Sequence, residues 1–503
     1  MNVLTQVTGA GLAFAMAASA SAFQDSGQDS GRYEFSDAQI ETANTLAETA
    51  LNSDLGFEIL ESLTTEIGPR LGGSPEEERA RDWAVDMFNE LGFSNVRTET
   101  FDMPYWTRGA LNVEITAPYP QILYATDLGG SAATPDGGIE AELVYFASFD
   151  DLAQSAGDGS LEGRIAYIDD HMVAAQTGAG YGPANNKRRF GWLEAQARGA
   201  IGVVIRSVGT DSHRMPHTGG ISVPSANSVT GLSQIAQDYL AEAYPDFADT
   251  PARSRIPAIA LSAPDADQVA RIHEMGDTMT LSLSSEAGWR GTTQSGNVIA
   301  EIPGRELPDE IVLIGAHLDS WDEGTGAVDD GAGVAIVTAA ARLIADLPEN
   351  PRRTIRVVLF GAEEVGLLGA FAYAAEHADE IGNHFVASES DFGAGRVWRF
   401  SSGVSEAGTP AMDAIGRVIA PHGVIPGSRT SRSGGPDIIP LSIAGVPVFR
   451  LEQDGSDYFD LHHTPDDTLD KVVPEALAQN VAVWAATVYL AAETEVEFRT
   501  QSE

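Results

Sequence analysis

The chain has 503 residues, with 73 Asp plus Glu against 30 Lys plus Arg, so its formal net charge at pH 7 is −43. This length exceeds one ordinary core and predicts two or three domains. Such an acidic surface repels phosphate groups, which argues against nucleic acid and membrane as partners. Cysteine is absent, so disulfides and thiolate ligands are excluded and a transition metal would depend on His and carboxylate side chains.

The first residues have the pattern of an export signal. Residues 7–20 are small and apolar, and the Ala-Ser-Ala sequence at 20–22 has the form of a cleavage site. No Lys or Arg precedes Arg32, so the usual positive start is missing, and a frayed cytoplasmic terminus is the alternative. We predict a signal peptide over 1–22, a linker over 23–35, and an exported protein, either periplasmic or extracellular.

Two helices are predicted next, over residues 36–66 and 75–91. The second has a strong start signal, with Ser74 as cap, Pro75 in the first turn and three glutamates facing the positive helix end. Gly92 ends this helix.

Between residues 111 and 288 the pattern changes to short strand-like runs and Gly-rich turns. Strands are predicted over 112–116, 142–145, 164–168, 201–205, 258–261 and 278–284. One helix is predicted, over 190–198. This pattern predicts a β-rich module inserted into a larger domain. The two parts of the larger domain are then residues 36–110 and 289–503.

From residue 297 onward, strands and helices alternate. Strands are predicted over 311–315, 354–360, 385–388 and 447–451, and helices over 331–346 and 367–376. The alternation predicts an α/β domain in which helices flank a central mixed, largely parallel sheet. In such sheets ligands bind beyond the carboxyl ends of the strands.

Three of these strands lead directly into metal-binding residue types. The first leads to His317 and Asp319, the second to Glu363 and Glu364, and the third to Asp391. Because the strands are predicted to be parallel, these side chains are expected at one edge of the sheet. Imidazole and carboxylate together suit zinc, and two such ions near each other need a bridging carboxylate.

Two further segments add candidates. Asp329 lies in an Asp-Asp-Gly turn at a helix start, and a late loop carries His462 and His463. Alone, each motif has an ordinary explanation, such as a solvated acid pair or a helix cap. The remaining histidines lack comparable context and are assigned structural roles: His171, His213, His217, His273, His377, His384 and His422.

The order His-x-Asp, Asp-Asp-Gly-x-Gly, Glu-Glu, Glu-Ser-Asp and His-His resembles the M28 metallopeptidase family, and within it the plasma glutamate carboxypeptidase branch. The resemblance covers roughly residues 40–495 and includes the inserted module. The matching stretches are 205–208, 216–219, 315–322, 329–331, 389–391 and 459–468.

The resemblance implies two zinc ions per chain. His317 and Asp391 would hold one ion, Glu364 and His463 the other, and Asp329 would bridge them. His463 is chosen over its neighbour because the family spacing to a downstream Asp-Thr pair fits from His463.

The resemblance also implies a mechanism and an assembly. Glu363 would act as general base for a metal-activated water, and Asp319 would orient the imidazole of His317. The inserted module would be a protease-associated domain over the cleft, and the chain would form a homodimer. The expected substrates are short peptides, cleaved as dipeptides or at an N-terminal residue.

Two other functions remain as alternatives: a single-zinc glutaminyl cyclase and a non-catalytic, receptor-like relative. The complete ligand set argues against both. Substrate contacts are less determined. Arg429 and Arg432 could bind a substrate carboxylate or simply offset the acidic surface, and His462 or Tyr458 could donate to the oxyanion or simply pack the loop.

Overall fold

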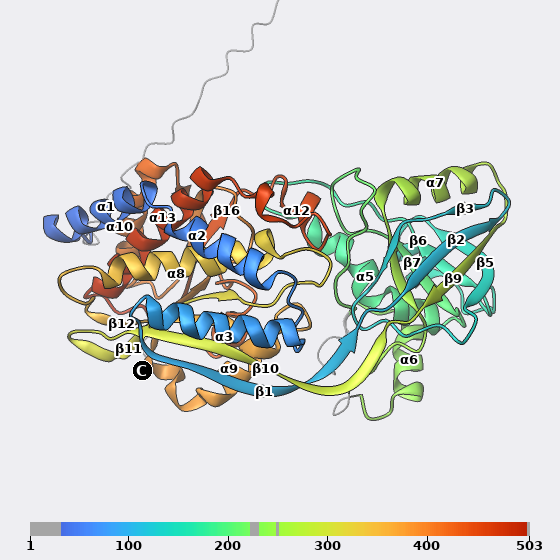
Figure 1. The fold of residues 1–503 in the computed structure, drawn as a ribbon, viewed down its shortest axis with the longest axis horizontal. Coiled ribbons are helices and arrows are strands. Elements are labelled where there is room, and N and C mark those ends of the chain that lie inside the picture. The colour runs from blue at the N-terminus through green and yellow to red at the C-terminus, as the bar shows by residue number, and fades with distance from the viewer. Residues whose placement is uncertain (1–31, 222–230, 248–250, 500–503) are drawn as a thin grey trace, which may run out of the picture.

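The computed structural model describes residues 32–221, 231–247 and 251–499, which form an elongated molecule with two sheets side by side (Figure 1). The predicted signal peptide over 1–22 lies outside these residues, as does most of the predicted linker. Among the described residues, no helix combines the length and apolar character needed to cross a membrane.

Four helical segments open the described chain: α1 (Asp37–Leu51), α2 (Leu55–Ser62), the π-helical turn η1 (Leu63–Ile67) and α3 (Pro75–Glu90). The single helix predicted over 36–66 is wrong, because the chain leaves the helical conformation between α1 and α2. The start of α3 is confirmed, since the Ser74 hydroxyl accepts a hydrogen bond from the backbone N–H of Glu77.

The first sheet has eight strands in the order β1-β10-β12-β11-β13-β16-β14-β15. β12, β11, β13 and β16 are consecutive parallel neighbours, and antiparallel pairs lie on either side of them. The bounds are β1 (Ser94–Thr107), β10 (Gly288–Ile302), β11 (Leu307–His317), β12 (Arg353–Phe360), β13 (His384–Glu389), β14 (Val397–Gly403), β15 (Ile425–Pro426) and β16 (Val448–Gln453).

Alternate residues of β11 face two separate cores, because successive strand side chains point to opposite faces. Val312 and Ile314 pack in the core shared with α8 (Ala332–Ala345) and α13 (Pro474–Glu493). Leu313 packs in a second core that includes residues of α9 (Leu368–Glu376). Helices therefore cover both faces, and the predicted α/β fold with a mixed sheet is confirmed.

The other helical segments of this region have between 3 and 11 residues. They are η2 (Ala327–Gly331), η3 (Ala378–Asn383), α10 (Thr409–Ile419), η4 (Ala420–His422), α11 (Ile439–Ile443), α12 (Tyr458–Leu461) and η5 (Leu469–Lys471).

The second sheet lies between residues 111 and 285 and has the order β3-β2-β9-β5-β6-β7-β8-β4. β5, β6, β7 and β8 are parallel neighbours. The bounds are β2 (Leu111–Ala117), β3 (Gln121–Ile122), β4 (Ala125–Asp127), β5 (Ile139–Phe146), β6 (Ile165–Ile168), β7 (Gly202–Arg206), β8 (Ala258–Leu261) and β9 (Met279–Ser285). We call this region, residues 111–285, the insert.

The insert contains more helix than the sequence predicted. The helix expected over 190–198 begins earlier, as α5 (Tyr181–Gln196), and three further helices are present: α4 (Phe149–Gln154), α6 (Gln234–Ala243) and α7 (Ala263–Glu274). The start of α7 repeats the signal that identified α3, a Ser cap followed by Pro in the first turn. The description of the insert as a β-rich module with few helices is therefore corrected.

Two long strands join the halves of the molecule. β1 and β10 pair antiparallel along their length and run from the first sheet to the insert (Figure 1). The sequence did not predict either strand. The half of β10 nearest the insert is mostly exposed and lacks the alternation that marks a half-buried strand.

Candidate metal centre

The predicted ligands gather at one edge of the first sheet. β11, β12 and β13 are parallel neighbours, so their carboxyl ends share this edge. His317 is the last residue of β11, and Glu364 and Asp391 closely follow the ends of β12 and β13. Asp329 lies in η2 and His463 follows α12. The structure therefore brings five predicted ligands together from five separate segments.

Asp329 is the centre of this cluster. Its Oδ1 lies 3.1 Å from Nε2 of His317, and that nitrogen lies 3.8 Å from Oδ1 of Asp391. Its Oδ2 lies 3.3 Å from Nε2 of His463, which in turn lies 3.0 Å from Oε2 of Glu364. One carboxylate thus presents a different oxygen to each of two donor groups.

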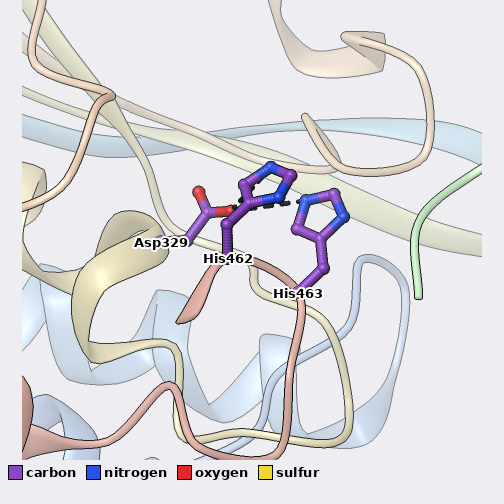
Figure 2. A group of neighbouring side chains, drawn as sticks. All are labelled: Asp329, His462 and His463. Carbon is purple, nitrogen blue, oxygen red and sulfur yellow. Dashed lines mark ion pairs between the residues drawn. The ribbon is translucent and has the colours of Figure 1, made fainter. Parts of the chain in front are cut away.

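His462 is a further donor on the second side of Asp329 (Figure 2). Its Nε2 lies 3.6 Å from Oδ2 of Asp329, and its ring stacks on that of His463 with the centroids 3.5 Å apart. The second donor group therefore contains both Glu364 and His462 beside His463.

The cluster holds unused hydrogen-bonding capacity. Glu364 Oε1 and His462 Nδ1 are buried without a hydrogen-bond partner among the described residues. A cavity of about 10 Å³ is lined by Asp329, Glu364 and His463, among others. Because buried polar atoms are normally paired, these donor atoms fit a metal ion.

Burial and neighbouring charges shift the pKa values of the cluster. Burial, together with the carboxylates of Asp391 and Glu364, raises the pKa of Glu363 well above its ordinary value. Burial lowers the pKa of His463, but the Glu364 and Asp329 carboxylates outweigh this effect and raise that pKa to about 9. A bound cation would relieve the crowding of buried carboxylates, because opposite charge favours their ionised form.

Asp319 supports the site through two groups, its backbone carbonyl and its carboxylate. Nδ1 of His317 donates to the backbone carbonyl oxygen of Asp319 at 2.9 Å, whereas the carboxylate oxygen Oδ1 lies 3.7 Å away. That oxygen also accepts a hydrogen bond from the backbone N–H of Glu363 at 3.0 Å. Asp319 thus contacts the imidazole through both its backbone carbonyl and its carboxylate, and the carboxylate also holds the loop that carries Glu363, so the orienting role stays a prediction.

Two charged residues that received no predicted role support the ligand loops. The Asp467 carboxylate accepts hydrogen bonds from the backbone N–H groups of Val328 and Asp329, at 2.6 and 3.1 Å. The fully buried Arg70 donates to three carbonyl groups between residues 318 and 326. Local pattern could not identify Arg70, since those carbonyls lie about 250 positions away in the sequence.

The two arginines proposed for substrate binding have partners or neighbours outside the predicted ligand set. Arg429 donates through Nε to Asp413 Oδ1 at 2.6 Å and through Nη1 to the Phe400 carbonyl at 3.1 Å. It therefore fits the alternative, charge compensation. Arg432 lines a cavity of about 430 Å³ whose lining includes none of the predicted metal ligands.

Comparison with known proteins agrees with these observations. A model of the sequence family described as Peptidase family M28 matches residues 297–488. Human carboxypeptidase Q is 32% identical over 439 residues, covering 87% of this chain and 85% of that protein. The chain belongs to peptidase family M28. It is thus a metallopeptidase, and the resemblance noted in its sequence is confirmed.

Solved structures extend the comparison across the chain. A crystal structure of a Peptidase M28 precursor from Shewanella amazonensis is 46% identical, with a TM-score of 0.85, and the match covers 93% of this chain and 99% of that one. A zinc aminopeptidase from Bacillus subtilis is 20% identical with a TM-score of 0.60, over 88% of this chain and 95% of that one, and shows the shared fold.

In this M28 peptidase the insert contacts the loop that leads to His463. The backbone N–H of Thr210 donates to the Phe459 carbonyl at 3.1 Å, and its hydroxyl donates to Asp460 Oδ1 at 2.6 Å. Gln176 donates to Asp454 Oδ2 at 2.8 Å. The sequence did not predict these contacts, because they join residues that are more than 200 positions apart.

Proposed function

We propose that this M28 peptidase binds two zinc ions and hydrolyses short peptides at a chain end. The observation that carries the proposal is the position of Asp329, whose two oxygens face two separate donor groups. In this assignment His317 and Asp391 hold one ion, and Glu364 and His463 hold the other. Asp329 bridges them.

Zinc suits the donor set. Imidazole and carboxylate are ordinary zinc ligands, and the Bacillus subtilis relative is named a zinc aminopeptidase. Glu364 is preferred over His462 in the second group because it carries the negative charge that a cation favours, and its Oε2 lies 3.0 Å from Nε2 of His463. When bound, zinc would polarise the substrate carbonyl and lower the pKa of water.

Glu363 is assigned as the general base. Its carboxylate is adjacent in sequence to the proposed ligand Glu364, and a carboxylate beside the metal can accept a proton from water and later donate it to the leaving amine. The hydrogen bond from its backbone N–H to Asp319 fixes the start of the loop on which it sits.

His462 and Tyr458 are candidates for a hydrogen bond to the oxyanion. The His462 ring lies beside Asp329, with Nδ1 unpartnered among the described side chains, and the Tyr458 ring lies 5.1 Å from it. A preorganised donor at this position would stabilise the charge that develops on the carbonyl oxygen.

The substrate assignment draws on the named relatives, which include carboxypeptidase Q and an aminopeptidase. Short peptides are compatible with both a carboxypeptidase and an aminopeptidase activity. Which terminus of the substrate is cleaved stays open. A glutaminyl cyclase with a single zinc is the alternative enzyme, but the second donor group argues against it. The proposal also includes export of the chain and pairing into a homodimer.

The test is metal removal followed by reconstitution. Exhaustive chelation should abolish hydrolysis of a dipeptide panel, and added zinc should restore it. Parallel assays on N-blocked and C-amidated peptides would identify which terminus is required. Full peptidase activity after chelation would overturn the proposal, and cyclisation of N-terminal Gln without hydrolysis would favour the alternative.

A further inference from the structure

Two consecutive residues of the insert hold the two peptide groups that flank His463. Nδ1 of His217 lies 2.8 Å from the carbonyl oxygen of His462, to which it donates. The backbone N–H of Thr218 donates to the carbonyl oxygen of His463 at 2.9 Å. One carbonyl belongs to the peptide plane before the His463 Cα and the other to the plane after it, so these bonds fix both backbone dihedrals of His463.

His463 needs such external support. Its φ is 63°, in the left-handed region that residues with a side chain seldom adopt. A conformation of this kind persists only where the surrounding structure holds it. The bonds from His217 and Thr218 supply that hold from outside the first sheet.

The same segment also faces the imidazole ring of His463. The carbonyl oxygen of Thr218 lies 3.3 Å from Nδ1 of His463, on the opposite side of the ring from Glu364 and Asp329. Nη1 of Arg188 lies at the same distance from Nδ1 and donates to the same Thr218 carbonyl at 3.2 Å. With its proton on Nδ1, directed at the Thr218 carbonyl, the ring leaves its Nε2 lone pair free for a metal ion. A metal-binding imidazole requires this arrangement.

His217 is itself rigidly placed. It is buried, its backbone N–H donates to the Ser207 hydroxyl at 2.8 Å, and its Nε2 pairs with Asp211. A Cβ on Gly209 would lie 2.3 Å from the His217 ring, so a larger residue there would displace the imidazole. The ring is therefore clamped between an acidic partner and the loop of the metal centre.

We propose that His217 is a positioning residue for the metal centre, which holds His463 in its binding geometry from the insert. The inference rests on the proposed function, since it takes His463 to be a zinc ligand. It replaces the structural role that the sequence assigned to His217. It also gives the insert a part in metal binding that a simple cover over the site would not have.

The test compares zinc affinities of His217→Leu and His217→Gln, measured by titration against a competing indicator. Loss of a residue that orients a metal ligand typically weakens affinity about 10- to 100-fold. We expect His217→Leu to weaken one of two zinc sites by this factor and to leave the other unchanged. His217→Gln keeps an N–H donor for the His462 carbonyl and should recover most of the affinity.

His213→Leu is the matched control, because His213 lies on the same segment but is exposed, and both zinc affinities of this variant should equal those of the wild type.

If His217→Leu does not fold, Asp211→Ala releases the His217 ring without touching the loop of the metal centre and should weaken the same single zinc site. Thermal melting of the zinc-free variants separates a role in positioning His463 from a role in packing the insert. Lower melting temperatures with unchanged zinc affinities would show that His217 only packs the insert, and would overturn the inference.

The outcome also separates this inference from the proposed function. Wild-type protein that binds no zinc would refute both. Wild-type protein with two zinc sites, both unchanged in the folded His217→Leu and Asp211→Ala variants, would refute the positioning role alone.

Discussion

The first sheet and the insert reach the metal centre in different ways. From the first sheet, His317, Glu364 and Asp391 arrive at or just beyond the ends of parallel strands, so strand order alone brings them together. From the insert, residues such as His217 arrive from a connecting segment that follows β7. A sheet edge predicts convergence of ligands, whereas a loop that docks across two regions carries no local sign of its target.

The largest expected effect tests the first-sheet side of this comparison. Glu363→Gln should retain zinc but lower turnover about 10²- to 10⁴-fold, because an amide cannot accept the proton. Glu364→Gln should instead lose zinc, since a neutral oxygen is a poorer ligand. Zinc content and kcat measured on both variants decide the assignment, which is reversed if Glu363→Gln loses zinc and Glu364→Gln keeps it.

The next effect concerns the loop on which both regions converge. His462→Phe or Tyr458→Phe should lower turnover on a good dipeptide by about 10²- to 10³-fold if that residue donates to the oxyanion. Zinc content and thermal stability must be unchanged for the comparison to hold. Near-native turnover in both variants would show that neither residue donates to the oxyanion and that both simply pack the loop.

A third prediction concerns the joint between the two regions. Arg108 donates to Asp322 at 2.8 Å and to the Thr218 hydroxyl at 3.1 Å, in a largely buried position. Arg108→Leu should lower the free energy of unfolding by about 1.5–3 kcal/mol, because it removes charge-assisted hydrogen bonds to the partly buried Asp322. Denaturant unfolding measures this change.

The control for Arg108→Leu is Arg79→Leu, which removes an exposed ion pair with Glu76. Exposed pairs contribute about 0–1 kcal/mol, so this variant should be close to the wild type. Equal effects of the two substitutions would mean that Arg108 does not hold the joint.

The smallest effect belongs to a structural histidine of the first region. A hydrogen bond to Glu99 raises the pKa of His377 above 6.5, although partial burial opposes the rise. A folded pKa above the unfolded value stabilises the protein below about pH 6.5, and this stability is lost as pH rises through the raised pKa. The contribution is below about 1 kcal/mol, because the partner Glu99 is partly exposed to solvent.

Unfolding of the wild type and His377→Gln between pH 5.5 and 8.5 measures this effect. The wild type should be the more stable at low pH, and the difference should shrink as the pH rises. A constant difference would show that the charge on His377 makes no contribution.

The sequence predicted the α/β fold and the strands that lead to His317, Glu364 and Asp391, because burial and strand period are local properties. It missed β10, whose half nearest the insert lacks a clear period. It missed β1 as well, although residues 100–105 of that strand alternate between exposed and more buried positions. It also missed Arg70 and His217, because their partners lie about 245 or more positions away. Spacing along the chain carries no information on such contacts.

The most direct test of the account is a crystal of the zinc-loaded protein measured at the zinc absorption edge. The account predicts two anomalous peaks roughly 3.5–4 Å apart. One should lie between His317 and Asp391, the other between Glu364 and His463, with Asp329 shared. A single peak, or two peaks that do not share Asp329, would contradict it.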